Sequence, residues 1–420
     1  MTALLPTSPG PTEDSLLTDA LRSQGRERAQ PVIDWLATMR LRQTRITLLF
    51  DGFLRQLSAV GVPLHRSTLH LRQLHPQLRA RTVLWEGEAG GAMEIPRAHG
   101  IEVSDLFLKS PVKLLFDGGA PVRRRLALPG CPIDFPITED LKGQGYTDYT
   151  ARPLPFSTRQ INTLTLATRH AGGFSDLDIA TVEAAAPLFG VLLELRNAYR
   201  TSQTLMETYL GTRSAHKVLA GTIRRGEVER INAVLWTSDM RDFTGLSMKL
   251  PMEEVVQLLD DYFQAMAEAI NANGGEILKF IGDAVLAIFP IEEKHAGDPC
   301  RACMASMLAA RAALDNIERV RDERRAAGKP DARCGIALHV GDVMYGNIGA
   351  ADRLDFTVIG PAVNLVSRIE TLNHDLSVPL VYSGAFAGHW LGASRSLGFH
   401  ALKGFAEPEE VFTLAEEQTP

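Results

Sequence analysis

Two aspartates in the second half of the chain have the type and setting for metal-dependent phosphoryl chemistry. Asp239 ends a run of apolar and β-branched residues, and Asp283 stands in a turn between two further runs. Carboxylates suit hard cations, and two of them could hold two Mg²⁺ ions about 3.5–4 Å apart, the spacing that binds the attacking and leaving oxygens of a phosphoryl transfer. Either aspartate alone could also be a turn residue that accepts backbone N–H groups.

The turn that carries Asp283 belongs to a predicted hairpin. Glu276 to Ile281 and Ala284 to Phe289 are rich in β-branched and aromatic residues, and Gly282-Asp283 between them is a strong hairpin signal. Lys279 interrupts the first run, where a buried ammonium group would be unfavourable unless another group accepts its hydrogen bonds. Packing alone explains such a lysine poorly, so we expect it to have a function.

A loop follows Asp239 and leads toward a predicted helix. Its sequence, Met240 to Gly245, could direct backbone amides toward an anion. We therefore expect Phe243 and Thr244 to lie among the substrate-binding residues.

Length and composition restrict the class of protein. A chain of 420 residues predicts two domains with connecting helices, and 45% hydrophobic with 22% charged residues is ordinary globular composition. The net charge of −6 argues against a nucleic-acid-binding protein. Four cysteines in a chain of this size indicate a reducing compartment, and we interpret Cys300 and Cys303 as core residues because no second pair stands at zinc spacing.

No targeting or membrane segment is predicted. The first fifteen residues lack the basic start and apolar run of a signal peptide. The most apolar stretch, Ile179 to Leu195, is interrupted by Glu183, Pro187 and Glu194, whereas a bilayer requires about 20 apolar residues. We therefore expect a cytoplasmic protein with no membrane partner.

The first half of the chain predicts a mobile arm over residues 1–30, which could end in a short helix, and a small domain over residues 31–176. Helical periodicity runs from Val32 to Ala59. The predicted strands are His65 to Leu74, Arg81 to Glu86, Tyr146 to Leu154 and Ile161 to Ala167. Ser175 is a plausible N-cap of the next helix, with Asp176 and Asp178 in its first turn.

This order of elements resembles a GAF domain, a small-molecule sensor module. The resemblance rests on GYTDYTARPLPF (residues 145–156) and on the stretch from Ile161 to Leu195, which look like its closing strands and exit helix. It implies a sensor of an unknown small-molecule or protein signal. His170 and Cys131 could bind haem or a metal, but a histidine beside two glycines is more often a loop residue.

Helical periodicity then continues from Leu177 to about Leu219, well beyond the mean helix length of about 11–12 residues. We assign residues 177–229 to a signalling helix and its connector. Such a helix between two domains favours pairing with a second copy of the chain, although packing against the first domain remains an alternative.

The remaining residues, 230–415, predict a second domain of the α+β class, with helices on a mostly antiparallel sheet. The predicted elements are strands at Ala233 to Asp239, the hairpin above, Arg333 to Val340, Val343 to Ile348, Phe356 to Ile359, Pro379 to Tyr382, Leu397 to Leu402 and Glu410 to Leu414, and helices at Met252 to Ala272, 296–327 and Pro361 to Leu372. Gly341-Asp342 is predicted to turn a second hairpin.

Three motifs in this domain closely resemble the catalytic domain of the class III nucleotidyl cyclases. They are DMRDFT from Asp239, KFIGD from Lys279 to Asp283, and TVIGPAVNLVSR from Thr357 to Arg368. The resemblance implies a homodimer with catalytic sites at the subunit interface, each using the lysine of one subunit and the aspartates of the other. It also implies that Asp239, Asp283 and the Met240 carbonyl bind Mg²⁺ or Mn²⁺, two per site.

The same resemblance assigns Lys279 and Thr357 to the recognition of the purine. An ammonium group can donate to N1 of adenine, whereas guanine presents an N–H there, and a hydroxyl can accept from the adenine amino group. The pair therefore predicts ATP as the substrate and favours it over GTP.

Asn364 and Arg368 are four residues apart and would share one face of a helix. They resemble the family's ribose-orienting asparagine and the arginine that stabilises charge on the α-phosphate, a task suited to the permanently charged guanidinium. Lys403, in LKGF, resembles a lysine that contacts the terminal phosphates.

These residues predict an adenylate cyclase that makes cyclic AMP and pyrophosphate from ATP under control of the N-terminal sensor. One alternative is a nucleotide-binding dimeric regulator without catalysis, and another is a guanylate cyclase.

Overall fold

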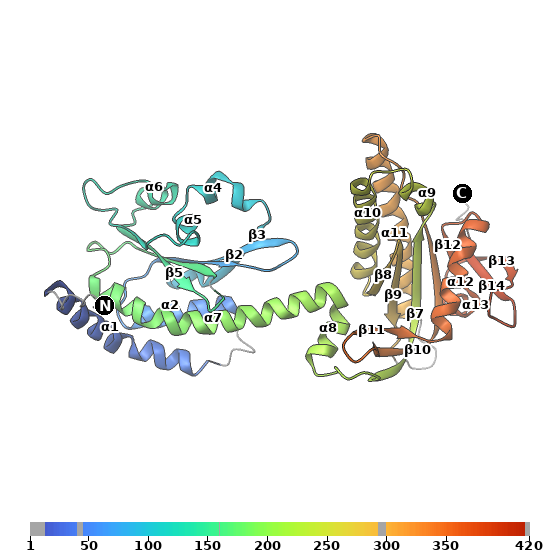
Figure 1. Cartoon of the computed structure of the whole chain (residues 1–420), viewed down its shortest axis with the longest axis horizontal. Coiled ribbons are helices and arrows are strands. Elements are labelled where there is room, and N and C mark those ends of the chain that lie inside the picture. The colour runs from blue at the N-terminus through green and yellow to red at the C-terminus, as the bar shows by residue number, and fades with distance from the viewer. Residues whose placement is uncertain (1–12, 40–44, 159, 293–299, 416–420) are drawn as a thin grey trace, which may run out of the picture. The chain divides into compact units, whose positions relative to one another are not determined.

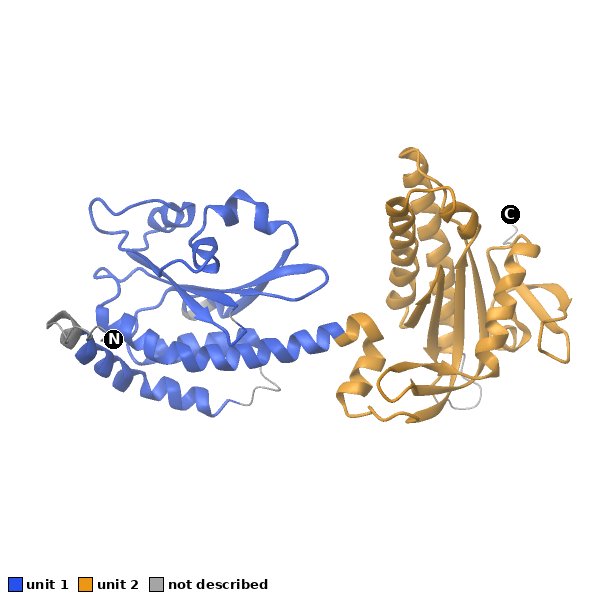
Figure 2. Ribbon diagram, in the orientation of Figure 1, with its two compact units in different colours: residues 1–205 blue, residues 206–420 orange. Residues whose placement is uncertain are grey.

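A computed structural model of the chain describes residues 13–39, 45–158, 160–292 and 300–415 (Figure 1). It divides into two compact units, Met1–Leu205 and Met206–Pro420 (Figure 2). Each unit combines helices with a largely antiparallel sheet, in agreement with the predicted α+β class.

The sheet of the first unit has the strand order β3-β2-β1-β6-β5-β4, and its paired strands are antiparallel. Its strands are β1 (Arg66–Arg72), β2 (Leu78–Glu86), β3 (Ala92–Ala98), β4 (Val122–Arg124), β5 (Asp148–Pro155) and β6 (Ile161–Thr168). The four strands predicted for this region are thus confirmed, with ends shifted by at most three residues. Alternation directs Leu69 and Leu71 of β1 to one face, and Thr68 and His70 to the other.

Helices cover both faces of this sheet (Figure 1). They are α1 (Glu13–Ala37), α2 (Ile46–Ala59), α3 (Gly87–Gly90), η1 (Ile101–Val103), α4 (Asp105–Leu108), α5 (Pro111–Phe116), α6 (Pro136–Gly143) and α7 (Asp176–Leu210). Buried residues of α1, α2 and α7 form the larger core with the sheet, where the rings of Phe53 and Phe189 stack 4.1 Å apart. The short helices α4 to α6 lie over the opposite face.

The start of the chain differs from the prediction. Residues 13–30, expected in a mobile arm, belong to α1, where Ala29 and Val32 are buried in the core. The low mean hydropathy of the segment concealed this helix, because only a narrow apolar stripe contacts the unit. Residues 1–12 lie outside the described part of the chain. The helix expected from Val32 to Ala59 is two helices, α1 and α2.

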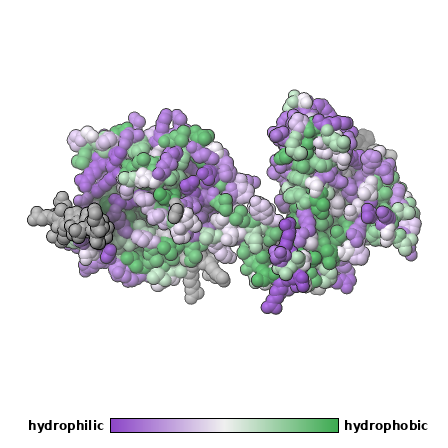
Figure 3. All heavy atoms as spheres, in the orientation of Figure 1, coloured by the Kyte–Doolittle hydropathy of each residue, from purple (hydrophilic) through white to green (hydrophobic). Residues whose placement is uncertain are grey.

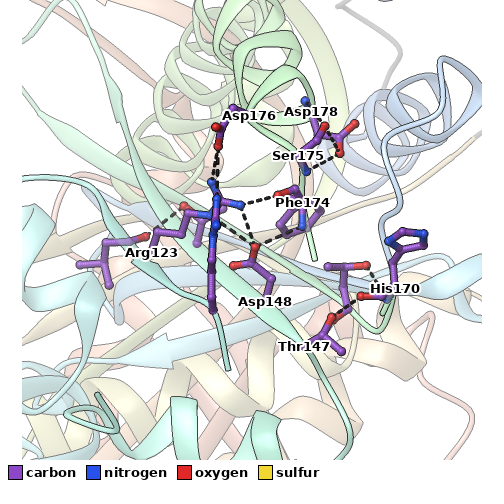
Figure 4. A network of polar contacts seen from close by, with 12 residues as sticks. Arg123, Thr147, Asp148, His170, Phe174, Ser175, Asp176 and Asp178 are labelled. Carbon is purple, nitrogen blue, oxygen red and sulfur yellow. Dashed lines mark hydrogen bonds and ion pairs between the residues drawn. The ribbon is translucent and has the colours of Figure 1, made fainter. Parts of the chain in front are cut away.

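The predicted start of α7 is confirmed (Figure 4). The Ser175 hydroxyl accepts from the N–H of Asp178 over 3.1 Å, while the carboxylate of Asp178 accepts from the N–H and hydroxyl of Ser175 over 2.8 Å. Nearby, Arg123 joins Asp148 and Asp176. His170 is an exposed loop residue, and Thr147 donates to its carbonyl over 2.6 Å.

The long helical segment is interrupted once. It consists of α7, which ends at Leu210, and α8 (Thr212–Leu219), with Gly211 between them at φ +84°. Only glycine adopts this conformation without strain, so the residue explains where the helix breaks.

The sheet of the second unit has the strand order β13-β14-β12-β10-β7-β9-β8, with β11 paired to β10. Its strands are β7 (Val228–Met240), β8 (Glu276–Ile281), β9 (Ala284–Pro290), β10 (Cys334–Gly349), β11 (Leu354–Ile359), β12 (Leu380–Ser383), β13 (Ser394–His400) and β14 (Glu409–Leu414). Its helices after α8 are α9 (Phe243–Ser247), α10 (Met252–Ala272), α11 (Arg301–Ala326), α12 (Pro361–Asp375) and α13 (Gly384–Ala387).

Both faces of this sheet are covered, which explains the continuous apolar run in β7. Val234 and Trp236 pack with α10 and α11, whereas Ala233 and Leu235 pack on the other face with α12. The hairpin of β8 and β9 and the helix from Met252 to Ala272 are confirmed. The helix predicted over residues 296–327 is observed as α11, and residues 296–299 of that prediction lie outside the described residues.

The second predicted hairpin is wrong. Gly341 and Asp342 do not turn the chain, because they lie within β10 and pair with Ala233 and Asn232 of β7. Long antiparallel pairing with β7 therefore overrides the local turn preference of the Gly-Asp dipeptide.

The four cysteines are free thiols, and Cys300 and Cys303 are buried in the core as predicted. In the described part of the chain, none of the helices has the length and apolar character needed to span a bilayer.

Candidate active site

The ends of two neighbouring strands bring Asp239 and Asp283 together. Ser238 of β7 pairs with Val285 of β9, so Asp239 lies beside the turn that carries Asp283. Burial, a hydrogen bond with Asp283 and the charges of Asp283 and Glu370 raise the pKa of Asp239 to about 7. The N–H of Met240, which donates to Asp239 Oδ1 over 3.0 Å, acts in the opposite direction on this pKa.

This carboxylate pair fits a hard divalent cation. Two half-buried carboxylates in contact repel one another when ionised, and a cation between them would remove that repulsion. Among the described residues no cluster of three or more His, Cys, Asp and Glu side chains could hold a metal. Further ligands would therefore have to be backbone carbonyls, water or substrate oxygens, as is usual for Mg²⁺.

A third carboxylate near the pair was missed by the sequence analysis. Glu370 of α12 is close enough for its charge to raise the pKa of Asp239. Burial raises the pKa of Glu370 itself to about 6, and the charge of Asp283 acts in the same direction. Its neighbour Arg241 opposes this rise in pKa, and the same guanidinium donates to the backbone carbonyls of Asn373 and Val378.

Lys279 has an acidic partner in the same chain, Asp355 of β11. Asp355 and Thr357 are two residues apart on that strand and so point to the same face. Lys279 is part-exposed and Thr357 is buried, with 6% of its surface exposed. The structure thus places the two residues predicted to recognise the purine near one another. Asp355 accepts a hydrogen bond from the Lys279 ammonium. Nothing in the sequence motif singled out Asp355.

Asn364 and Arg368 lie on α12 and are both exposed, four residues apart on one face as predicted. Arg368 forms no ion pair with any residue that the structure describes. Its guanidinium is therefore available to an anion.

The loop after Asp239 is short and sharply turned. Asp242 adopts a left-handed conformation, φ +58°, and α9 begins directly after it. Phe243 and Thr244 thus stand in the first turn of a helix, where backbone N–H groups have no intrahelical acceptor. Met240 is buried at the end of β7.

Lys403 is exposed in the turn between β13 and β14. Within the described residues, no hydrogen bond or ion pair connects its side chain to the other candidate residues. The structure therefore does not bring it into the cluster formed by the two aspartates.

Comparison with known families identifies the second unit. Residues 228–385 match the family model of the adenylate and guanylate cyclase catalytic domain, and this stretch contains every candidate site residue except Lys403. The second unit therefore contains a class III cyclase catalytic domain. The first unit lies outside that match.

Two similar curated proteins carry adenylate cyclase names. The chain is 31% identical over 272 residues to "Adenylate cyclase 1" of Rhizobium meliloti (strain 1021), covering 61% of this chain and 38% of that protein. It is 38% identical over 138 residues to "Adenylate cyclase" of Anabaena cylindrica, covering 32% of this chain and 26% of that protein. The chain thus spans less than half the length of these relatives.

Among solved structures, a bacterial light-regulated adenylyl cyclase is 29% identical, with a TM-score of 0.44 over 53% of this chain and 63% of that chain.

Proposed function

We propose that this protein is an adenylate cyclase that converts ATP to cyclic AMP and pyrophosphate. The observation that carries the proposal is the contact of Asp239 with Asp283 inside the stretch that matches the cyclase catalytic domain. The relatives named adenylate cyclase support the same reaction.

The arrangement of Lys279 and Thr357 supports ATP over GTP. Lys279, oriented by Asp355, would donate to N1 of adenine, and the Thr357 hydroxyl would accept from the amino group. Guanine carries an N–H at N1, so this group and the Lys279 ammonium would be two donors facing each other. It also has a carbonyl in place of the amino group, so the Thr357 hydroxyl would have no donor from which to accept. A guanylate cyclase is the alternative, and it would require a different use of both side chains.

In the proposed reaction the ribose 3′-oxygen attacks the α-phosphorus, a 3′,5′-cyclic phosphodiester forms and pyrophosphate leaves. Bound Mg²⁺ or Mn²⁺, held by Asp239, Asp283 and the carbonyl of Met240, would supply charge neutralisation and a lower pKa for the 3′-hydroxyl. Asn364 would orient the ribose, and Arg368 would stabilise the charge that develops on the α-phosphate. The amides of Phe243 and Thr244 would bind phosphate oxygens, with Lys403 contributing at the terminal phosphates.

A homodimer is part of the proposal. Apolar side chains gather on the face of the second unit that carries β8 and β9 (Figure 3), and Phe280 and Ile281 there are 51% and 56% exposed. A second copy would cover them, because exposed apolar patches commonly mark interfaces. The lysine of one subunit would then work with the aspartates of the other.

The first unit would be the regulatory part, a GAF-like sensor that acts through α7 and α8. Its signal, a small molecule or a protein, would shift the population of catalytically competent dimers. This role rests on the order of elements in the first unit alone. The match to the cyclase family begins only at residue 228 and therefore does not bear on it.

The test is incubation of the purified full chain with Mg²⁺ or Mn²⁺ and either ATP or GTP, followed by chromatography of the products. We expect cyclic AMP and pyrophosphate from ATP, and at least tenfold less cyclic GMP. Nucleotide binding without product would instead favour a silent dimeric regulator. Faster conversion of GTP would establish the guanylate cyclase alternative.

A further inference from the structure

A cavity of about 400 Å³ lies in the first unit, between its sheet and the segment that contains α4 and α5. Strands β1, β2, β3, β5 and β6 contribute its floor, while residues 101–117 and 136–137 contribute the rest of its wall. Its volume is in the range typical of pockets for small organic ligands.

The floor of the cavity carries a continuous chain of polar contacts. Arg97 donates to the hydroxyl of Thr82 over 3.4 Å, and Thr82 contacts His70 Nδ1 over 3.2 Å. His70 Nε2 contacts Thr68 over 2.9 Å, and Thr68 contacts Thr165 over 2.5 Å. These groups come from four separate strands, so the sheet register assembles them.

The electrostatic character of the cavity is positive. Six Arg and Lys residues line it, against the two acidic residues Glu102 and Asp117. Four of the six have acidic partners, in the pairs Arg66–Glu86, Arg79–Glu102, Lys109–Asp105 and Lys113–Asp117. Burial and the charges of Arg97 and Arg66 lower the pKa of His70 to about 3, so this imidazole is neutral at physiological pH.

The other two arginines, Arg72 and Arg97, form no ion pair with any described residue. Arg72 of β1 pairs with Ala80 of β2, and Ala80 pairs with Arg97 of β3. The backbone positions of the two arginines therefore lie in one row across the sheet, two strand spacings or about 10 Å apart, with only the methyl side chain of Ala80 between them. This row leaves space for an anionic group flanked by two cations.

The remaining wall is largely apolar and aromatic. Phe107 and Phe116 lie with ring centroids 5.9 Å apart, and the Arg72 guanidinium lies 5.4 Å from the centroid of Phe116. Leu106 and Ile137 also line the cavity. An apolar or aromatic group could thus pack beside the charged row.

We propose that this cavity binds a small organic anion, with its carboxylate or phosphate between Arg72 and Arg97 and its apolar body against Phe107 and Phe116. The hydroxyls of Thr68, Thr82 and Thr165 and the neutral His70 supply further hydrogen bonds to polar groups of the ligand. The inference concerns the first unit alone and does not depend on the reaction proposed for the second.

The test uses the full chain and two fluorescent probes of similar shape, the anion 8-anilinonaphthalene-1-sulfonate and the neutral N-phenyl-1-naphthylamine. We expect tighter binding of the anion by the wild-type protein. Arg72→Gln and Arg97→Gln should each weaken binding of the anion about tenfold, because each removes a charged hydrogen-bond donor, and should leave binding of the neutral probe unchanged. Arg97→Lys should retain most of the affinity.

Arg125→Gln is the matched control, because Arg125 is exposed in the same unit and does not line the cavity. Displacement of the anionic probe by phenyl phosphate or benzoate, but not by benzyl alcohol, would support the proposal and tell which anion the cavity prefers. Equal loss of both probes in Arg97→Gln, unchanged binding of the anion in both glutamine variants, or no binding of the anion by the wild type would overturn it. Far-ultraviolet circular dichroism of each variant checks that it is folded.

Discussion

The carboxylates of Asp239 and Asp283 lie in contact although both residues are half-buried. Such an arrangement is unfavourable in the protein alone, because two like charges must either share a proton or repel each other. A divalent cation between the two carboxylates would remove this repulsion, and we therefore expect the site to bind one.

Replacement of one aspartate tests this interpretation. Asp239→Asn removes one charge, so the variant without metal should melt at the same temperature as the wild type or a few degrees higher. Addition of Mn²⁺ should raise the melting temperature of the wild type and leave that of the variant unchanged, because binding to the folded state stabilises it. Differential scanning fluorimetry measures both.

Asp342→Asn is the control for this experiment, because Asp342 is an acidic residue of the same unit that pairs with Arg230. It should keep the full response to Mn²⁺. An Asp239→Asn protein that still gains stability from Mn²⁺ would show that the metal binds elsewhere.

Asp355 forms an ion pair with Lys279, the residue proposed to recognise the purine. Its carboxylate holds the Lys279 ammonium near Thr357, and a free lysine side chain would sample more rotamers. Asp355→Asn should therefore lower kcat/KM for ATP about two- to fivefold, as expected from loss of an exposed ion pair of up to about 1 kcal/mol.

Steady-state assays with ATP and GTP measure the effect, with Asp342→Asn again as the control. A higher kcat/KM for ATP in Asp355→Asn would mean that the ion pair blocks the purine site instead of preparing it.

At the scale of elements, the connection from α7 into the second unit rests on a buried polar contact. Glu276 of β8 accepts from the N–H and hydroxyl of Ser214 in α8, over 2.8 and 2.9 Å, and from the hydroxyl of Tyr345 in β10. Gly211 lies against the same carboxylate, where an added Cβ would stand 2.9 Å from Glu276 Oε1. The position of α8 on this sheet thus depends on one glycine and one glutamate.

Gly211→Ala should destabilise the second unit. The positive φ of +84° costs about 1–2 kcal/mol for a residue with a Cβ, and the close approach to Glu276 adds to this. Gly221→Ala is the matched comparison, since it also has a positive φ, +109°, but no atom lies within 4 Å of the added Cβ.

Chemical denaturation followed by tryptophan fluorescence gives the two free energies of unfolding. We expect the larger loss for Gly211→Ala. Equal losses would mean that contact with Glu276 has no energetic effect beyond backbone strain.

At the scale of the whole molecule, the proposed activity requires two copies of the chain. Each protomer has the aspartates proposed to bind metal and the residues proposed to bind the purine and the phosphates, but one site would take them from different protomers. Two inactive variants with defects on opposite sides of the site should then complement each other.

Asp239→Ala and Arg368→Ala should each lower turnover of ATP by at least a hundredfold. Mixing them should restore up to about one quarter of the wild-type activity, because random exchange makes half of the dimers mixed and each mixed dimer has one intact site. Cyclic AMP formation measured against the mixing ratio provides the readout.

Sedimentation of each variant and of the mixture serves as the control for association. A mixture that stays inactive while the variants fold and exchange subunits would exclude a site shared between protomers.

The sequence alone was sufficient where structure depends on neighbours along the chain. The hairpin around Gly282-Asp283, the helix Met252–Ala272 and the cap at Ser175 follow from local periodicity and from the hydrogen bonds that a short segment makes with itself. The motifs around Asp239 and Asp283 likewise predicted that these two residues would lie together in one site.

Tertiary structure decided what depends on pairing between distant segments. β10 continues through Gly341-Asp342 because β7 supplies a partner for every residue there, which no local preference reveals. Glu370 joins the aspartates from α12, and Asp355 joins Lys279 from β11. Arg72 and Arg97 lie in one row on either side of Ala80 only because three strands adopt one register, and register is a property of the folded sheet.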